Sequence, residues 1–100
     1  MIQLLTESRI AALIFDGVQD ATIQSLNVES NANAESALRF INTQDVLVTA
    51  PRILSPAAVF LQVEGSKNQR ITIDGGDISR ATTALAFRDG AEKSSVKLRD

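Results

Sequence analysis

The chain of 100 residues contains no cysteine, histidine, tryptophan or tyrosine. Without cysteine there is neither a disulfide scaffold nor a thiolate metal site. Without histidine there is no imidazole metal ligand and no Cys-His or Ser-His pair for nucleophilic catalysis. Only carboxylates, lysines and arginines remain as catalytic candidates. The four phenylalanines are the only aromatic side chains, so the exposed Trp or Tyr common in open sugar-binding clefts is also missing.

Charge and hydrophobic runs exclude further classes of partner. The formal net charge is −2, and the lysines and arginines are scattered, so we expect neither nucleic acid nor an acidic membrane surface as a partner. No apolar run approaches the roughly 20 residues that span a bilayer. The segment Met1–Glu7 is too short and too acidic for a signal peptide. No cofactor is implied.

Hydrophobic residues recur along the chain with a spacing of 25 residues. A fixed period of this size is the signature of a stacked-repeat architecture. Three series share this period: Ala21, Val46, Ile71 and Val96; Ile23, Val48, Ile73 and Leu98; and Val28, Ile53 and Ile78. The sequence therefore predicts a solenoid of about four coils.

A further apolar pair precedes each repeat, with a spacing of 25, then 23, then 24 residues. This unequal spacing predicts a connection of variable length inside each coil, between strands that stack regularly. The pairs are Leu13 and Phe15, Leu38 and Phe40, Leu61 and Val63, and Leu85 and Phe87.

Within each pair the two apolar residues are separated by one residue, which is the alternation of a short strand with one buried face. No segment carries the period of a helix over ten or more residues. Each coil is thus predicted as strand, turn, strand, bend, short third strand and return loop. The return loops are expected at residues 29–35, 54–57 and 79–83.

These features predict an all-β fold, a right-handed parallel β-helix, with the hand taken from the bias of parallel crossover connections. We expect residues 1–100 to form a single β-helix domain that is a fragment of a longer β-helix. Residues 1–11 are a lead-in or cap, or the last strand of an earlier coil. The open ends make end-to-end self-association a further expectation.

Two features are candidate ligand contacts, and each has a simpler structural interpretation. Asp74 and Asp77 flank the Gly75-Gly76 bend and resemble an acid/base pair, but Asp-Gly-Gly-Asp is also ordinary turn chemistry. Phe60 is out of phase with the inward pairs, so it either packs under a loop or corner or is an exposed contact. No residue is assigned a catalytic or metal-binding role.

Several polar residues are interpreted as parts of turns. Asp20 and Asp45 share one repeat position, which Asn68 approximately occupies in the third coil, and we expect side chain to backbone hydrogen bonds there. Bend residues are expected after the first strand of a coil at Asp16, Gly17, Glu64 and Gly65.

Three strings of the chain, at residues 7–20, 37–40 and 59–68, resemble the C-terminal coils of polygalacturonase-like glycoside hydrolases, family 28, of the pectin lyase-like fold. The resemblance covers most of the chain from Glu7 to about Ile78. It implies an exported, secreted or periplasmic enzyme that cleaves pectic polysaccharide with inversion. Its catalytic pattern of several Asp, a His and an Arg-Lys pair does not carry over, since no His, no Asn-Thr-Asp string and no Asp-Asp pair is present.

Two functional hypotheses follow. In the first, the chain is a structural C-terminal β-helix segment of a pectin-degrading or polysaccharide-degrading hydrolase, stacked on upstream coils that carry the active site and bind pectic polysaccharide. In the second, it is a non-catalytic β-solenoid module for attachment or assembly. Upstream coils with paired Asp, His and Arg-Lys would select the first hypothesis, and an unrelated upstream domain would select the second.

Overall fold

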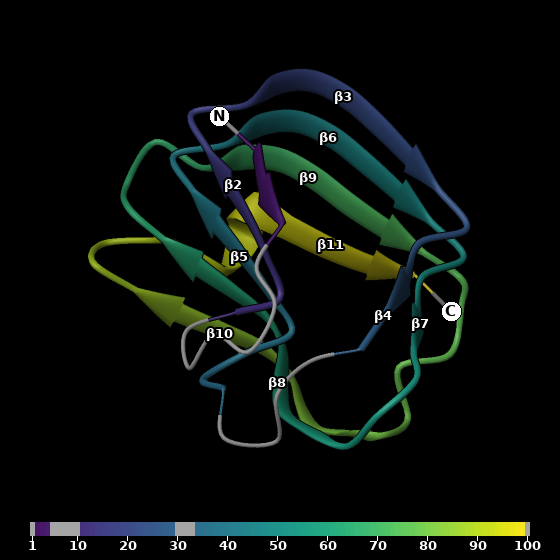
Figure 1. Ribbon diagram of the computed structural model, residues 1–100. Helices are drawn as coiled ribbons and strands as arrows, with labels where there is room; N and C mark the ends of the chain where they lie inside the picture. Colours follow the sequence, from purple (N-terminus) through teal and green to yellow (C-terminus); the bar gives the residue numbers. More distant parts are fainter. Residues whose placement is uncertain (1, 5–10, 30–33, 100) are drawn as a thin grey trace.

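The computed structural model describes residues 2–4, 11–29 and 34–99. This part of the chain forms short strands and one 3₁₀ helix, arranged around a three-sided interior (Figure 1). The elements are β1 (Ile2–Leu4), β2 (Leu13–Asp16), β3 (Gln19–Gln24), β4 (Asn27–Val28), β5 (Leu38–Ile41), β6 (Gln44–Thr49), β7 (Arg52–Ile53), β8 (Ala57–Glu64), β9 (Gln69–Asp74), β10 (Ala81–Arg88), η1 (Lys93–Ser95) and β11 (Val96–Arg99).

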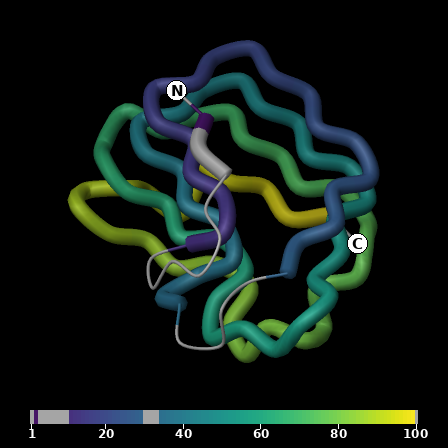
Figure 2. The backbone as a smooth tube through the Cα atoms, in the orientation of Figure 1, coloured from purple at the N-terminus to yellow at the C-terminus, as the bar shows by residue number. Residues whose placement is uncertain are grey.

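The strands stack coil upon coil in three sheets, as the tube in Figure 2 makes plain. Sheet A has the order β1-β2-β5-β8-β10, sheet B the order β11-β9-β6-β3, and sheet C pairs β4 with β7. All neighbours are parallel except β1 and β2. The chain is therefore a parallel β-solenoid of about three turns, with four parallel layers in sheets A and B.

The observed register confirms the predicted ladders. On sheet B, Val46 is paired with Ala21 and Ile71, and Val48 is paired with Ile23 and Ile73. The last layer continues both rows, with Val96 against Ile71 and Leu98 against Ile73. The predicted pairs on the other side form sheet A in the expected order: Leu13, Leu38, Leu61 and Leu85, and Phe15, Phe40, Val63 and Phe87.

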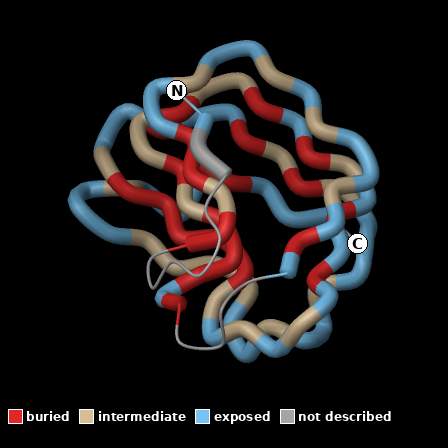
Figure 3. The backbone as a smooth tube through the Cα atoms, viewed as in Figure 1, coloured by how far each residue is buried: buried red, intermediate tan, exposed pale blue. Residues whose placement is uncertain are grey.

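The interior is filled by these ladders, and the buried stripes in Figure 3 follow the same positions from coil to coil. Leu38, Phe40, Val48, Leu61 and Ile73 are all 0% exposed. Burial of an aliphatic or aromatic side chain of this size stabilises the fold by roughly 1.5 to 3 kcal/mol. The core is therefore the main source of stability, and each ladder depends on the layer above and below it.

Every coil bends at equivalent residues that adopt positive φ angles. Backbone N–H groups at several of these bends donate to carbonyls of the next coil, as in Gly17 to Ile41 O and Ala50 to Asp74 O. Most residues with a Cβ tolerate this conformation poorly. Glycine adopts it readily, and Asn and Asp adopt it more readily than other residues with a Cβ. Three such rows run along the solenoid: Gly17, Asn42, Gly65 and Asp89; Asp20, Asp45 and Arg70; Ser25, Ala50 and Gly75.

The structure corrects the predicted elements in two places. Ala57 and residues 81–83, assigned to return loops, belong to β8 and β10, because parallel pairing of Ala57 with Ala81 and of Val59 with Thr83 extends both strands. The described part of the lead-in, Ile2–Leu4, forms an antiparallel edge strand on β2, unlike the last strand of an earlier coil, which would be parallel. Residues 5–10 of the lead-in and 30–33 of the first loop lie outside the described residues.

Candidate functional site

Asp74 and Asp77 are each held in a separate interaction. Gly75 and Gly76 have φ angles of 71° and 87°, which confirms the turn chemistry of the Asp-Gly-Gly-Asp string. Asp77 Oδ1 accepts hydrogen bonds from Ser79 N at 3.1 Å and Ser79 Oγ at 2.6 Å. These bonds hold the pKa of Asp77 below its usual value. Asp74 Oδ2 lies 3.8 Å from Arg99 Nη1 in an exposed ion pair.

Phe60 is completely buried, which confirms the packing interpretation. Phe60 belongs to the same buried apolar cluster as Leu61 and Val63, so its ring packs with the core although it is out of phase with the inward pairs. In its row the neighbouring strands carry alanine, at Ala37 and Ala84, because these residues precede the paired Leu38 and Leu85. The large ring therefore occupies space that two small neighbours leave, and it offers no exposed contact to a ligand.

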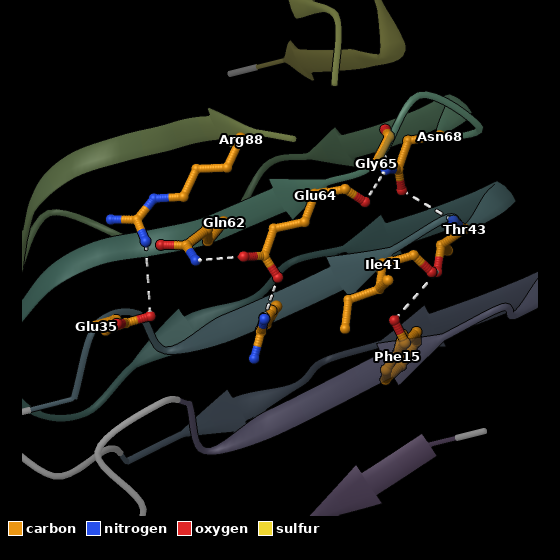
Figure 4. Close-up of polar contacts among 10 residues, drawn as sticks. Phe15, Glu35, Ile41, Thr43, Gln62, Glu64, Gly65, Asn68 and Arg88 are labelled. Atoms are coloured by element: carbon orange, nitrogen blue, oxygen red, sulfur yellow. Dashed lines mark hydrogen bonds and ion pairs between the residues drawn. The ribbon is translucent and has the colours of Figure 1, made fainter. Parts of the chain in front are cut away.

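The outer face of sheet A carries a buried polar network on β5 and β8 (Figure 4). Glu64 is 6% exposed and Gln62 is 1% exposed, although both side chains point away from the apolar interior. Glu64 forms an ion pair with Arg39 Nε, and its Oε1 accepts a hydrogen bond from Gln62 Nε2 at 3.2 Å. The buried carboxylate is thus paired and hydrogen-bonded, as a buried charge requires.

Glu35, just before β5, forms an ion pair that reaches across this outer face. Glu35 Oε2 lies 3.9 Å from Arg88 Nη1, although Arg88 belongs to β10 and β8 lies between the two strands (Figure 4). Neighbouring Ser36 is 1% exposed, and among the described residues its Oγ has no hydrogen-bond partner. The polar side chains of this face are thus engaged with one another and, through Glu35 and Arg88, across the sheet.

Hydrogen bonds connect three coils at one corner between sheets A and B. The Thr43 hydroxyl group is a donor toward two backbone carbonyls, Phe15 O at 3.2 Å and Ile41 O at 3.1 Å. The Thr43 N–H donates to Asn68 Oδ1 at 2.9 Å (Figure 4). Asn68 Nδ2 in turn donates to Glu64 O at 2.6 Å. These bonds satisfy buried backbone groups at the turn and give Asn68 a structural role.

Asp45 is paired with Arg70, not Asn68, because the register sets Gln44 against Gln69. This corrects the expectation of local side chain to backbone bonds at Asp45: the Arg70 guanidinium forms a two-point ion pair with its carboxylate. That contact lowers the pKa of Asp45 and raises the pKa of Arg70. With Asp20 the pair borders an open hollow of about 480 Å³ on the outer face of sheet B.

A second hollow, of about 450 Å³, lies where the turn after β8 meets the segment around η1. Polar side chains line it throughout: Gln44, Ser66, Lys67, Asn68, Gln69, Glu92, Ser94 and Ser95. Its best-buried members, Asn68 and Ser95, are already hydrogen-bonded to backbone carbonyls. Neither of these buried polar groups therefore lacks a hydrogen-bond partner.

Within residues 2–4, 11–29 and 34–99, no three acidic side chains converge in a group that could hold a metal ion. The same part of the chain has no helix suited to crossing a bilayer. The carboxylates of Asp45, Glu64, Asp74 and Asp77 take part in ion pairs or turns, and the residues that sequence reasoning missed are Arg39 and Glu64. Glu64 was interpreted as a bend residue, and only its separation of 25 residues from Arg39 hints at the contact.

The two ends of the stack leave residues of the interior ladders partly exposed. At the last layer Leu98 belongs to an interior ladder but is 40% exposed, and Leu85 and Phe87 are half-buried. In the first layer Ala21 and Ile23 of β3 are half-buried too. Among the described strands, β3 and β11 each have one unpaired edge. No family model, curated protein or solved structure matches this chain.

Proposed function

We propose that the chain is a structural β-solenoid segment that acts through its stack ends and not through catalysis. The observation that carries the proposal is the exposure of Leu98 in a ladder whose other members are buried or half-buried. A ladder residue exposed in this way is complementary to one further coil, since stacking neighbours bury a continuous core. This is the attachment or assembly module of the second hypothesis.

The chemistry of the described residues supports a role without catalysis. Of the candidate pair, Asp74 forms an ion pair with Arg99 and Asp77 accepts a hydrogen bond from Ser79. The candidate aromatic contact Phe60 is buried. Glycosidases use two carboxyl groups that flank one bond. The separate contacts of Asp74 and Asp77 support the structural role.

A titration with pectic oligosaccharides tests the proposal. Heteronuclear NMR spectra of the labelled chain are recorded with oligogalacturonides and with neutral pectic oligosaccharides, and the same samples are assayed for cleavage. We expect unmoved spectra and no products. Shifts that cluster at Asp74 and Asp77, or cleavage products, would overturn the structural role and locate a sugar site on the outer face of the bend.

The resemblance to polygalacturonase-like hydrolases supports a second candidate, in which the chain is the C-terminal scaffold of an exported pectin-degrading enzyme. Its partners are then the upstream coils of the parent, which hold the catalytic residues and the pectic polysaccharide. The test is the coding sequence upstream of Met1. Coils with paired Asp, a His and an Arg-Lys pair support this candidate, and an unrelated domain contradicts it.

A further inference from the structure

The two ends of the solenoid match each other in sheet B. β11 and β3 are parallel strands of the same sheet, and each has one unpaired edge among the described residues. Continuing the repeat beyond β11 places Val96 against Ala21 and Leu98 against Ile23 of a second copy. All these residues lie on interior ladders, and the second pair would cover the exposed Leu98.

The ends also carry opposite charge. Residues 11–29, which form the first coil, contain Asp16, Asp20 and Glu29 and no lysine or arginine. Residues 81–99, which form the last coil, contain four basic and two acidic residues. Opposite charges on facing surfaces favour head-to-tail encounter and disfavour the meeting of two like ends. A second copy of this chain is therefore the partner that both ends fit.

β1 stands in the way of this contact. It occupies the free edge of β2 in sheet A, one layer beyond the level at which β3 begins sheet B. If β11 of one copy pairs with β3 of the next, β10 of the first copy arrives at the layer that β1 already fills. Strands in adjacent layers are about 4.8 Å apart, so β10 and β1 cannot share it.

We infer that β1 is a removable cap, and that its release from β2 allows copies of the chain to stack head to tail, with β10 on β2 and β11 on β3. The inference rests on the proposed structural function and names its partner. The cap is weak by construction, since only three residues of β1 pair with β2. In the released state Phe87 of one copy covers Phe15 of the next, extending the row of sheet A.

Disulfide trapping tests the inference, because the chain has no native cysteine. Thr22→Cys and Lys97→Cys are made in separate proteins, at exposed positions that the stacking register makes direct neighbours. Both are combined with Ile2→Pro and Gln3→Pro, which remove the N–H donors of two consecutive residues, one of which points toward β2. Circular dichroism checks that the stack stays folded.

In the capless background we expect the mixed 22–97 disulfide to form, and more slowly at high salt because the charged ends are screened. With β1 intact, the same disulfide forms markedly more slowly. Equal rates in both backgrounds, no mixed disulfide, or a preference for 22–22 and 97–97 links would overturn the inference.

A second variant decides the matter if the double proline substitution unfolds the chain. Gln3→Cys with Ile14→Cys joins register partners of β1 and β2, so oxidation locks the cap and reduction frees it. We expect the oxidised protein to sediment as a monomer and the reduced protein to associate as its concentration rises; identical behaviour overturns the inference. Neither assay responds to sugar binding, so a failed stack is distinguishable from a failed structural role in the oligosaccharide titration.

Discussion

The rings of Phe15 and Phe40 stack with their centroids 4.9 Å apart and their planes 15° apart. The two residues are register partners on β2 and β5, so the ring separation reproduces the spacing of about 4.8 Å between strands. Val63 and Phe87 continue the row on β8 and β10. The aromatic pair is therefore a direct product of the 25-residue period that separates the two residues in the sequence.

Phe40→Ala tests this row at its best-buried member. Phe40 is 0% exposed between two layers, so we expect a loss of about 3 to 5 kcal/mol in the free energy of unfolding. Phe87→Ala is the matched control, and because Phe87 is half-buried in the last layer, we expect a loss of about 1 to 2 kcal/mol. Urea denaturation followed by circular dichroism measures both. Equal losses would contradict the order of the layers.

Arg39→Met tests the buried ion pair of sheet A. Glu64 would remain buried without its cation, and we expect a loss of about 2 kcal/mol, below the range for fully buried pairs because the Arg39 side chain is 25% exposed. Combining it with Glu64→Gln removes the stranded charge, so the double variant should recover most of that loss. A double-mutant cycle in urea measures the coupling. Strictly additive effects would show that the pair is not coupled.

Ser79→Ala tests the pKa of Asp77. The hydroxyl and N–H of Ser79 lower this pKa in the folded state, so they stabilise the fold above the unfolded pKa of about 3.9. That contribution is lost as the pH falls through the folded pKa. Removal of the hydroxyl should therefore move the pKa of Asp77 upward, toward its ordinary value. A carboxyl-carbon NMR titration measures this shift.

Asp45 is the internal control for that titration, because its pKa is lowered by the Arg70 guanidinium and not by Ser79. Its midpoint should be the same in both proteins. An unchanged midpoint for Asp77 in the variant would mean that the Ser79 hydroxyl does not act on this carboxylate.

The interior could be predicted from the sequence because a stacked core imposes its period on the chain. Ile23, Val48 and Ile73 must all be apolar to fill the same ladder, so the spacing alone yields both the fold class and the register. The outward positions follow by alternation, as at Leu47 and Thr72. The right-handed sense of the coil stays a prediction, which rests on the bias of parallel crossover connections.

The outer face of sheet A could not be predicted in this way. Gln62 and Glu64 are buried there, on the face where Glu35 and Arg88 form an ion pair. Contacts that occur once leave no period in the sequence, so nothing distinguishes these positions from exposed ones. The antiparallel pairing of β1 is hidden for the same reason, because a strand that occurs once has no repeat to reveal its partner.

Val48→Asp tests the assignment of inward and outward faces on β6. Val48 is 0% exposed, and an unpaired charge in its ladder should unfold the domain. Leu47→Asp is the matched control at the next residue, where the side chain is 37% exposed on the outer face. We expect its stability to change by about 0.5 kcal/mol or less. Thermal unfolding compares the two variants, and similar behaviour would contradict the register of the sheet.

Ala50→Gly tests the strain at the bend between sheets B and C. Ala50 has a φ angle of 50°, a conformation that costs a residue with a Cβ about 1 to 2 kcal/mol, and Gly75 holds the equivalent position in the next coil. Its N–H donates to Asp74 O at 2.8 Å, and glycine keeps this bond. After the entropy that glycine adds to the unfolded chain, we expect a net stabilisation of about 1 kcal/mol.

The matched control is Ala58→Gly, at an exposed alanine within β8 whose φ angle is not positive. Here glycine relieves no strain and only adds freedom to the unfolded chain, so we expect a loss of about 0.5 to 1 kcal/mol. Urea denaturation of both variants therefore gives effects of opposite sign. Destabilisation by Ala50→Gly would mean that the bend does not hold this residue in the left-handed region, and the row formed with Ser25 and Gly75 would no longer describe how each coil turns.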